Sequence, residues 1–304
     1  MSLTLDSAPT TAPTRRGLAR GLLRTARPKQ WTKNVLVLAA PVAGGRILEA
    51  AVLGHTAVVF VLFCCAASGI YLLNDAMDAE ADRAHPVKRF RPVASGEVPV
   101  AVAYAAGIGL SLVAVVGGAL LLNGTTALLL AVYSAIQIAY CVKLKHVAVL
   151  DIAVVASGFL MRGLAGGTAS AITPSQWFLI TVGFGSLFVV GAKRASELAK
   201  LGEDAKHTRK LLSEYSESYL RFVWQGAAAL MMLSYCLWAL EPDGSTLGQL
   251  RMLSIVPMTL AVLRYALIVD RGEGGAPEDV LLGDRVMLAL GGAWAVIYGT
   301  SVFL

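Results

Sequence analysis

The stretch that decides the fold is AAVLGHTAVVFVLFCCAASGIYLLNDAMDAEAD, residues 50–82. Its first part, residues 50–73, is apolar and long enough to cross the ~30 Å hydrocarbon core of a bilayer. Polar side chains gather at its end. On a helix that advances about 100° per residue, Glu80 points away while the other polar side chains share an arc of about 100°. These side chains are Tyr71, Asn74, Asp75, Asp78 and Asp82.

Carboxylates that share one helix face repel each other unless a cation neutralises them. An oxygen-rich site with few protein ligands suits Mg²⁺ that is held partly by substrate phosphates. Lys88, Arg89 and Arg91 follow in the next loop, where they would suit recognition of a diphosphate. The alternative is a solvated, charged helix end. We favour a site, because the acids share a face and adjoin a membrane span.

The composition is that of a membrane protein. Of the 304 residues, 56% are hydrophobic and only 15% are charged, whereas a soluble domain has about 25% charged residues. We expect an all-α, polytopic bundle of about nine transmembrane helices, the first of which is cut short by Gly44, Gly45 and Arg46. Residues 1–26 would be a cytoplasmic tail, disordered at its start, and 27–304 a single transmembrane catalytic domain. The candidate spans are 30–45, 50–73, 98–122, 124–142, 147–168, 174–192, 219–240, 250–269 and 285–303.

The basic residues alternate in step with these spans. The tail and every second loop hold 22 of the 26 Lys and Arg residues, and the opposite loops hold only Arg46 and Arg251. This alternation predicts that the N-terminus and the motif loops are cytoplasmic. The net charge of +6 is then a consequence of topology, and no nucleic-acid partner is needed to explain it.

Two further basic segments precede predicted spans. In RPKQWTKN, residues 27–34, Lys33 is placed to reach a bound phosphate, and Trp31 is expected to be an interfacial anchor. In YCVKLKHVAVLD, residues 140–151, Lys143 and Lys145 either bind an anion or merely set topology. Both interpretations stay open.

Later polar residues are also candidates. Asp151 and Arg162 lie 11 residues apart, which is about 20° around a helix and about 16 Å along it. They cannot share the first shell of one metal, but they can form a polar seam that faces the bundle interior. Lys193, Arg194 and Glu197 either frame an anionic substrate or include a simple Lys193–Glu197 surface pair.

Together these motifs resemble the UbiA superfamily of intramembrane prenyltransferases. Asn74-Asp75-x-x-Asp78-x-x-x-Asp82 matches its first aspartate-rich motif. The resemblance implies a nine-helix bundle with a central cavity that opens toward the cytoplasm and the lipid. The chain is more similar to the decaprenyl-phosphate phosphoribosyltransferase branch, through the segments RPKQWTKNVLVLAAP (27–41), NDAMDAEADRAHPVKRFRP (74–92) and FGSLFVVGAKRASEL (184–198).

That resemblance implies transfer of 5-phosphoribose from phosphoribosyl diphosphate to a polyprenyl (decaprenyl) phosphate, with release of diphosphate, for cell-wall arabinan precursors. The enzyme would lie in the plasma membrane with its active site on the cytoplasmic side, and a homo-oligomer is compatible with the sequence. Mg²⁺, with Mn²⁺ as a substitute, would be held by Asn74, Asp78 and Asp82. Asp78, Asp82 and Asp75 would be the catalytic residues.

The same resemblance assigns the substrate-binding residues. Tyr71 would donate a hydrogen bond, and Lys33, Lys88 and Arg89 would clamp phosphate. In place of the second aspartate-rich motif of the aromatic prenyltransferases, the chain offers Asp151 with a more basic set, which suits an additional phosphate. That set comprises Lys143, Lys145 and Arg162.

Two other functions remain open on sequence alone. An ordinary superfamily prenyltransferase would consume a prenyl diphosphate and pass the prenyl group to an aromatic acceptor. A transporter or membrane scaffold would leave its cargo chemically unchanged, and no repeat between the chain halves favours it.

Overall fold

The computed structural model describes residues 15–201, 210–241, 248–275 and 277–303, and these residues form helices and connecting turns without a strand. Within them, eight helical segments are long and apolar enough to span a membrane. The predicted all-α, polytopic architecture is therefore confirmed. The segments are α3 (Ala50–Met77), α5 (Val100–Leu121), α6 (Gly124–Val142), α7 (Leu150–Ala169), α8 (Gln176–Leu201), α10 (Glu217–Leu240), α11 with α12 (Gly248–Leu253 and Ile255–Asp270) and α14 (Arg285–Phe303).

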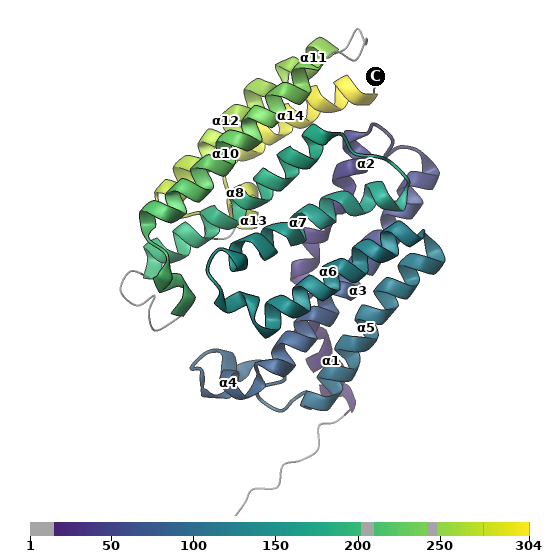
Figure 1. The fold of residues 1–304 in the computed structure, drawn as a ribbon, viewed down its shortest axis with the longest axis vertical. Coiled ribbons are helices and arrows are strands. Elements are labelled where there is room, and N and C mark those ends of the chain that lie inside the picture. The colour runs from purple at the N-terminus through teal and green to yellow at the C-terminus, as the bar shows by residue number, and fades with distance from the viewer. Residues whose placement is uncertain (1–14, 202–209, 242–247, 276, 304) are drawn as a thin grey trace, which may run out of the picture.

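The first predicted span, 30–45, differs from the others. It consists of the 3₁₀ helix η1 (Pro28–Leu38) followed by the short helix α2 (Ala39–Ala43). A 3₁₀ helix rises about 2.0 Å per residue, so η1 and α2 together reach about 30 Å, the thickness of a bilayer core. In Figure 1, α2 lies beside the start of α3, at the end of the bundle opposite α4 (Ala79–Ala84). The segment therefore runs the length of the bundle although it is not a long α-helix.

Close packing holds η1 against α7. A Cβ at Gly166 would lie 1.9 Å from the backbone oxygen of Val37, so only glycine permits this approach. Val37 is fully buried in the core between η1, α3, α6 and α7, which includes Phe63, Leu130 and Ala165. A second core joins α8, α10 and α12.

The helices α3 and α7 form the centre of the bundle. Of their most apolar windows, 67% and 61% of residues are buried, against 17% for α5 and 11% for α14. The apolar side chains that α5 and α14 leave exposed suit contact with lipid tails, which replace a protein core in a membrane. These two helices also carry five of the predicted polar residues, and of these Asp75, Asp151 and Arg162 are buried. The other two are Tyr71 and Asn74.

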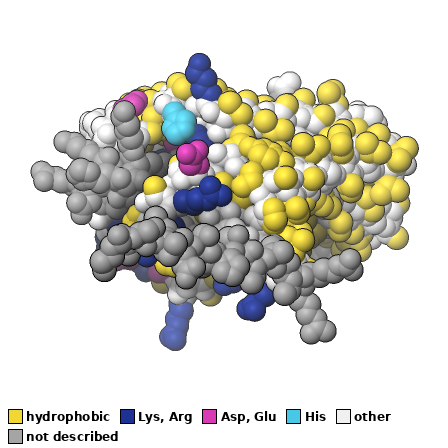
Figure 2. All heavy atoms as spheres, turned by 90° about the horizontal axis from the view of Figure 1, so that it is seen from below, with side chains coloured by type: hydrophobic (Ala, Val, Ile, Leu, Met, Phe, Trp, Pro, Cys, Tyr) yellow, Lys and Arg dark blue, Asp and Glu magenta, His cyan; other side chains and the backbone are white. Residues whose placement is uncertain are grey.

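One end of the bundle collects the charged segments. Helix α1 (Arg15–Ala26) packs Leu18 and Leu22 beside α4 and the base of α3, and the predicted tail therefore includes a helix; residues 1–14 lie outside the described part. Figure 2 looks onto this end, where basic, acidic and histidine side chains lie beside a broad hydrophobic surface. The shorter elements are η2 (Lys88–Phe90), η3 (Leu144–His146), η5 (Lys210–Glu214) and α13 (Pro277–Gly283).

Candidate functional site

The aspartate-rich motif lies at the junction of α3 and α4. Asp78 joins the two helices, and backbone hydrogen bonds from Asp78 N to Asn74 O (2.9 Å) and from Asp82 N to Asp78 O (2.8 Å) preserve the helical spacing across the junction. Asp75 and Asp82 are 2% and 3% exposed, whereas Glu80 is exposed to solvent. The predicted division between an inward carboxylate face and an outward Glu80 is therefore present.

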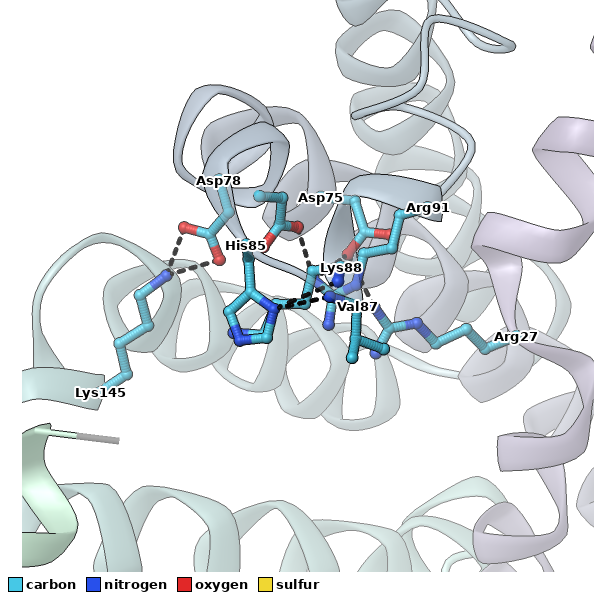
Figure 3. A network of polar contacts seen from close by, with 9 residues as sticks. Arg27, Asp75, Asp78, His85, Val87, Lys88, Arg91 and Lys145 are labelled. Atoms are coloured by element: carbon cyan, nitrogen blue, oxygen red, sulfur yellow. Dashed lines mark hydrogen bonds and ion pairs between the residues drawn. The ribbon is translucent and has the colours of Figure 1, made fainter. Parts of the chain in front are cut away.

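The carboxylates of Asp75, Asp78 and Asp82 are each paired with a cation (Figure 3). Arg27 Nη2 lies 2.7 Å from Asp75 Oδ1, and Lys145 Nζ lies 2.7 Å from Asp78 Oδ1. Arg91 Nη1 lies 2.7 Å from Asp82 Oδ2 and 3.3 Å from Asp75 Oδ1. Buried carboxylates need such partners, because an unpaired buried charge is strongly destabilising. The three cations come from separate segments of the chain, and all three contact the carboxylates of the acidic motif.

Arg27 is a member of this network that the sequence interpretation missed. It has a left-handed backbone (φ 54°, ψ 62°) just before Pro28, and its guanidinium lies 4.7 Å from the centroid of the Tyr71 ring. The sequence feature that could have identified Arg27 is its position as the first residue of the segment RPKQWTKN. Trp31, expected as an interfacial anchor, donates from Nε1 to Ser68 Oγ at 3.0 Å and so also ties η1 to α3.

The loop after α4 positions the other predicted bases. His85 Nδ1 accepts hydrogen bonds from the backbone nitrogens of Val87 (3.2 Å) and Lys88 (3.3 Å), which fixes the turn that carries η2 (Figure 3). Arg89 is exposed, with its guanidinium 4.9 Å from the centroid of the Phe90 ring. Of the remaining candidates, Lys143 is exposed, and Lys33 and Asn74 are half-buried.

A second polar cluster forms where α7 begins. Asp151 is 1% exposed, and its Oδ2 accepts a hydrogen bond from Arg194 Nε at 3.2 Å. Its Oδ1 accepts from the hydroxyl of Tyr215, a residue that the sequence interpretation did not identify. Burial, followed by the hydrogen bond to Asp151, raises the pKa of Tyr215 above its usual value. Arg194 Nη1 also contacts Glu197 Oε2 at 2.8 Å, and Lys193 Nζ lies 4.0 Å from Glu197 Oε1.

Arg162 lies in a different cluster, deeper in the bundle. Its Nε donates to Asn34 Oδ1 (2.7 Å), its Nη2 to the Tyr133 hydroxyl (2.8 Å) and its Nη1 to the backbone oxygen of Gly158 (2.8 Å). These contacts join η1, α6 and α7. Asp151 and Arg162 thus have separate partners although they face the interior from one helix.

The opposite end of the bundle holds an apolar cavity of about 380 Å³ between α2, α8, α10, α12 and α14. Its aromatic wall is held together by a hydrogen bond of 2.7 Å from Trp294 Nε1 to the Tyr235 hydroxyl. Such a lining suits a hydrocarbon chain. The principal lining residues are Val42, Phe178, Tyr235, Trp238, Trp294 and Tyr298.

The donor set of the acidic motif fits a hard divalent cation. Carboxylate and amide oxygens are the ligands that Mg²⁺ prefers, commonly completed by substrate phosphates. Among the described residues, no three His, Cys, Asp or Glu side chains meet to form a metal site unaided, so exogenous oxygens would have to complete the shell. The oxygens that would contribute belong to Asn74, Asp78 and Asp82.

Comparison with known proteins shows which family the chain belongs to. The profile of the UbiA prenyltransferase family matches residues 35–290, and the chain belongs to this family. The decaprenyl-phosphate phosphoribosyltransferase of Mycobacterium tuberculosis is 47% identical over 289 residues, covering 94% of this chain and 95% of the relative. The protein of the same name from Corynebacterium glutamicum is 46% identical over 300 residues, covering 95% and 89%. A UbiA homologue from Archaeoglobus fulgidus, solved bound to GPP and Mg²⁺, superimposes with a TM-score of 0.67 at 16% identity, covering 93% and 99%.

Proposed function

We propose that this protein transfers 5-phosphoribose from phosphoribosyl diphosphate to a polyprenyl phosphate and releases diphosphate. The observation that carries the proposal is the network of three carboxylates and three cations at one end of an apolar bundle. It is supported by relatives, 46–47% identical over nearly the whole chain, that are named for this activity on decaprenyl phosphate. The expected context is supply of cell-wall arabinan precursors.

The acidic motif and its bases would bind the donor. Phosphoribosyl diphosphate carries a diphosphate and a 5-phosphate, and charge-assisted hydrogen bonds from Lys and Arg recognise both groups. Lys145 is bound to Asp78 and only 16% exposed, so it is already desolvated and held in place. The exposed Arg89 and the half-buried Lys88 lie in the adjoining loop, where a soluble anion would arrive.

The transfer needs no general base from the protein. An oxygen of the lipid phosphate, ionised at neutral pH, forms the new bond to the anomeric carbon of ribose, while the bond from that carbon to the diphosphate oxygen breaks. A single displacement would invert an α-linked donor into a β-linked product. Mg²⁺ bound at Asn74, Asp78 and Asp82 would stabilise the negative charge that develops on the departing diphosphate; the A. fulgidus homologue was solved with this ion.

The bundle would hold the lipid. A polyprenyl chain can extend between the helices from the charged end, and the apolar cavity of about 380 Å³ near α2 offers further space for its hydrocarbon units. The distribution of basic loops favours a plasma-membrane enzyme whose charged end is cytoplasmic.

A direct assay tests the proposal. Purified protein in detergent receives labelled phosphoribosyl diphosphate, Mg²⁺ and decaprenyl phosphate, and the lipid product is separated by chromatography. Labelled phosphoribose should appear in the lipid fraction in equal amount to the diphosphate released. If the protein instead consumes a prenyl diphosphate in the presence of an aromatic acceptor, and leaves phosphoribosyl diphosphate intact, it is an ordinary prenyltransferase and the proposal is wrong.

A further inference from the structure

Val149 has a strained backbone in the short connection between η3 and α7. Its φ of 70° and ψ of −47° fall in a region that β-branched residues almost never occupy. The connection is short and tied by backbone hydrogen bonds, from Val147 N to Leu144 O and from Asp151 N to Val147 O, both 3.1 Å. Lys145 therefore lies at one end of a rigid turn and Asp151 at the other. A strained conformation of this kind persists only where its surroundings impose it.

The hydroxyl of Tyr215 contacts the strained residue itself and the Asp151 end of the turn. It accepts a hydrogen bond of 2.6 Å from the backbone nitrogen of Val149 and donates to the carboxylate of Asp151. Tyr215 is 6% exposed, and its ring packs in a core with Ile152 and Leu220. This tyrosine follows η5, 66 residues beyond Val149, so it reaches the turn from a different cytoplasmic segment.

We propose that Tyr215 is a positioning residue, whose hydroxyl holds the strained turn at Val149 and thereby fixes Lys145 against Asp78. The inference rests on the proposed function in that Lys145 and Asp78 would bind the donor. Without the hydroxyl, the nitrogen of Val149 loses its hydrogen-bond acceptor, and the carboxylate of Asp151 loses one of its donors. The valine would then relax toward negative φ, which redirects the chain between η3 and α7 and withdraws Lys145.

Four proteins test the idea: Tyr215→Phe, Val149→Gly, the double variant and Tyr219→Phe. Tyr219 is the matched control, because its ring stacks on that of Tyr215 with centroids 5.7 Å apart. Glycine adopts positive φ without steric cost. Val149→Gly therefore removes the backbone strain, and the Tyr215 hydroxyl is no longer needed to hold the turn. For each protein we would measure KM for phosphoribosyl diphosphate, KM for decaprenyl phosphate, kcat and the melting temperature.

Tyr215→Phe should raise the KM for phosphoribosyl diphosphate about 10-fold, which is the size of effect expected when one hydrogen bond is lost. The KM for decaprenyl phosphate should stay unchanged. Tyr219→Phe should match the wild type. Adding Val149→Gly to Tyr215→Phe should restore the donor KM to within about 2- to 3-fold of wild type, because the turn no longer needs to be held. A residue with a merely structural role would lower the melting temperature without this rescue.

Two results would overturn the inference. One is a Tyr215→Phe protein with an unchanged donor KM; the other is an impaired Tyr215→Phe protein that Val149→Gly fails to restore. If the wild type does not turn over phosphoribosyl diphosphate at all, the proposed function fails. The coupling between Tyr215 and Val149 would then still be measurable in the melting temperatures of the wild type, the two single variants and the double variant.

Discussion

Lys145 Nζ lies 2.7 Å from Oδ1 and 2.9 Å from Oδ2 of Asp78, although 67 residues separate the two in the chain. The ammonium group thus bridges both oxygens of the one motif carboxylate that is not fully buried, with 31% of its side chain exposed. At Asp75 and Asp82 the carboxylate is buried instead, and the arginine is the exposed member of the pair, at 32% for Arg27 and 29% for Arg91. Asp78 is therefore the motif carboxylate most open to an incoming cation, and Lys145 is the base beside it that an anionic substrate would meet.

Replacing Asp78 by Asn should abolish turnover without unfolding the protein. The change removes a negative charge from an accessible carboxylate that we assign to the metal, while its size and the helix junction are retained. Activity would be measured with labelled phosphoribosyl diphosphate and Mg²⁺, and folding by thermal denaturation. Glu80→Gln, on the exposed outer face of α4, is the matched control and should keep most activity. Excess chelator should reproduce the Asp78→Asn result, and full activity under either condition contradicts the assignment.

Lys145→Ala should weaken donor binding by about 10- to 150-fold, the range for loss of one charge-assisted hydrogen bond. The neighbouring Lys143 is exposed, so Lys143→Ala should change donor affinity by less than about 3-fold. Isothermal titration of phosphoribosyl diphosphate in detergent would give both values. Equal effects at the two lysines would mean that they act only through the general positive potential of the loop.

Arg91→Ala should destabilise the protein by about 2–3 kcal/mol, because it leaves two almost fully buried carboxylates without this partner. The comparison is Arg24→Ala, which removes an ion pair to Glu97 whose arginine side chain is 54% exposed and should cost less than about 1 kcal/mol. Chemical denaturation in detergent measures both changes. An Arg91→Ala protein as stable as Arg24→Ala would show that the ion pairs of Arg91 with Asp75 and Asp82 contribute little to stability.

Arg89→Ala should reduce affinity for the soluble donor and leave lipid affinity nearly unchanged. A lost phosphate contact costs about 1.5–3 kcal/mol, whereas binding of the lipid is dominated by burial of its hydrocarbon chain. Lys88→Ala should behave in the same way, and Arg20→Ala, an exposed base on α1, provides the control. The proposal for the η2 loop would be wrong if decaprenyl phosphate binding fell as much as donor binding.

The sequence predicted the features that depend on local periodicity. Apolar segments of bilayer length fixed the helical class, and the repeat of the helix placed the motif carboxylates on one face and Glu80 on the other. The structure has both features, with Asp75 and Asp82 buried and Glu80 exposed. The predicted span 30–45 is η1 followed by α2 and not one long α-helix, and composition reveals neither this geometry nor the close contact of Val37 with Gly166.

The sequence by itself determined the membrane bundle and the acidic face, because both follow from which residues recur within a few helical turns. Only the tertiary structure decided how the charges are paired. Arg27 meets Asp75 across 48 residues, Lys145 meets Asp78 across 67, and Tyr215 meets Asp151 across 64. Such partners are selected by the packing of distant helices, since a carboxylate in the protein interior pairs with whichever cation or hydrogen-bond donor the fold brings within reach. No local sequence pattern specifies contacts over such separations.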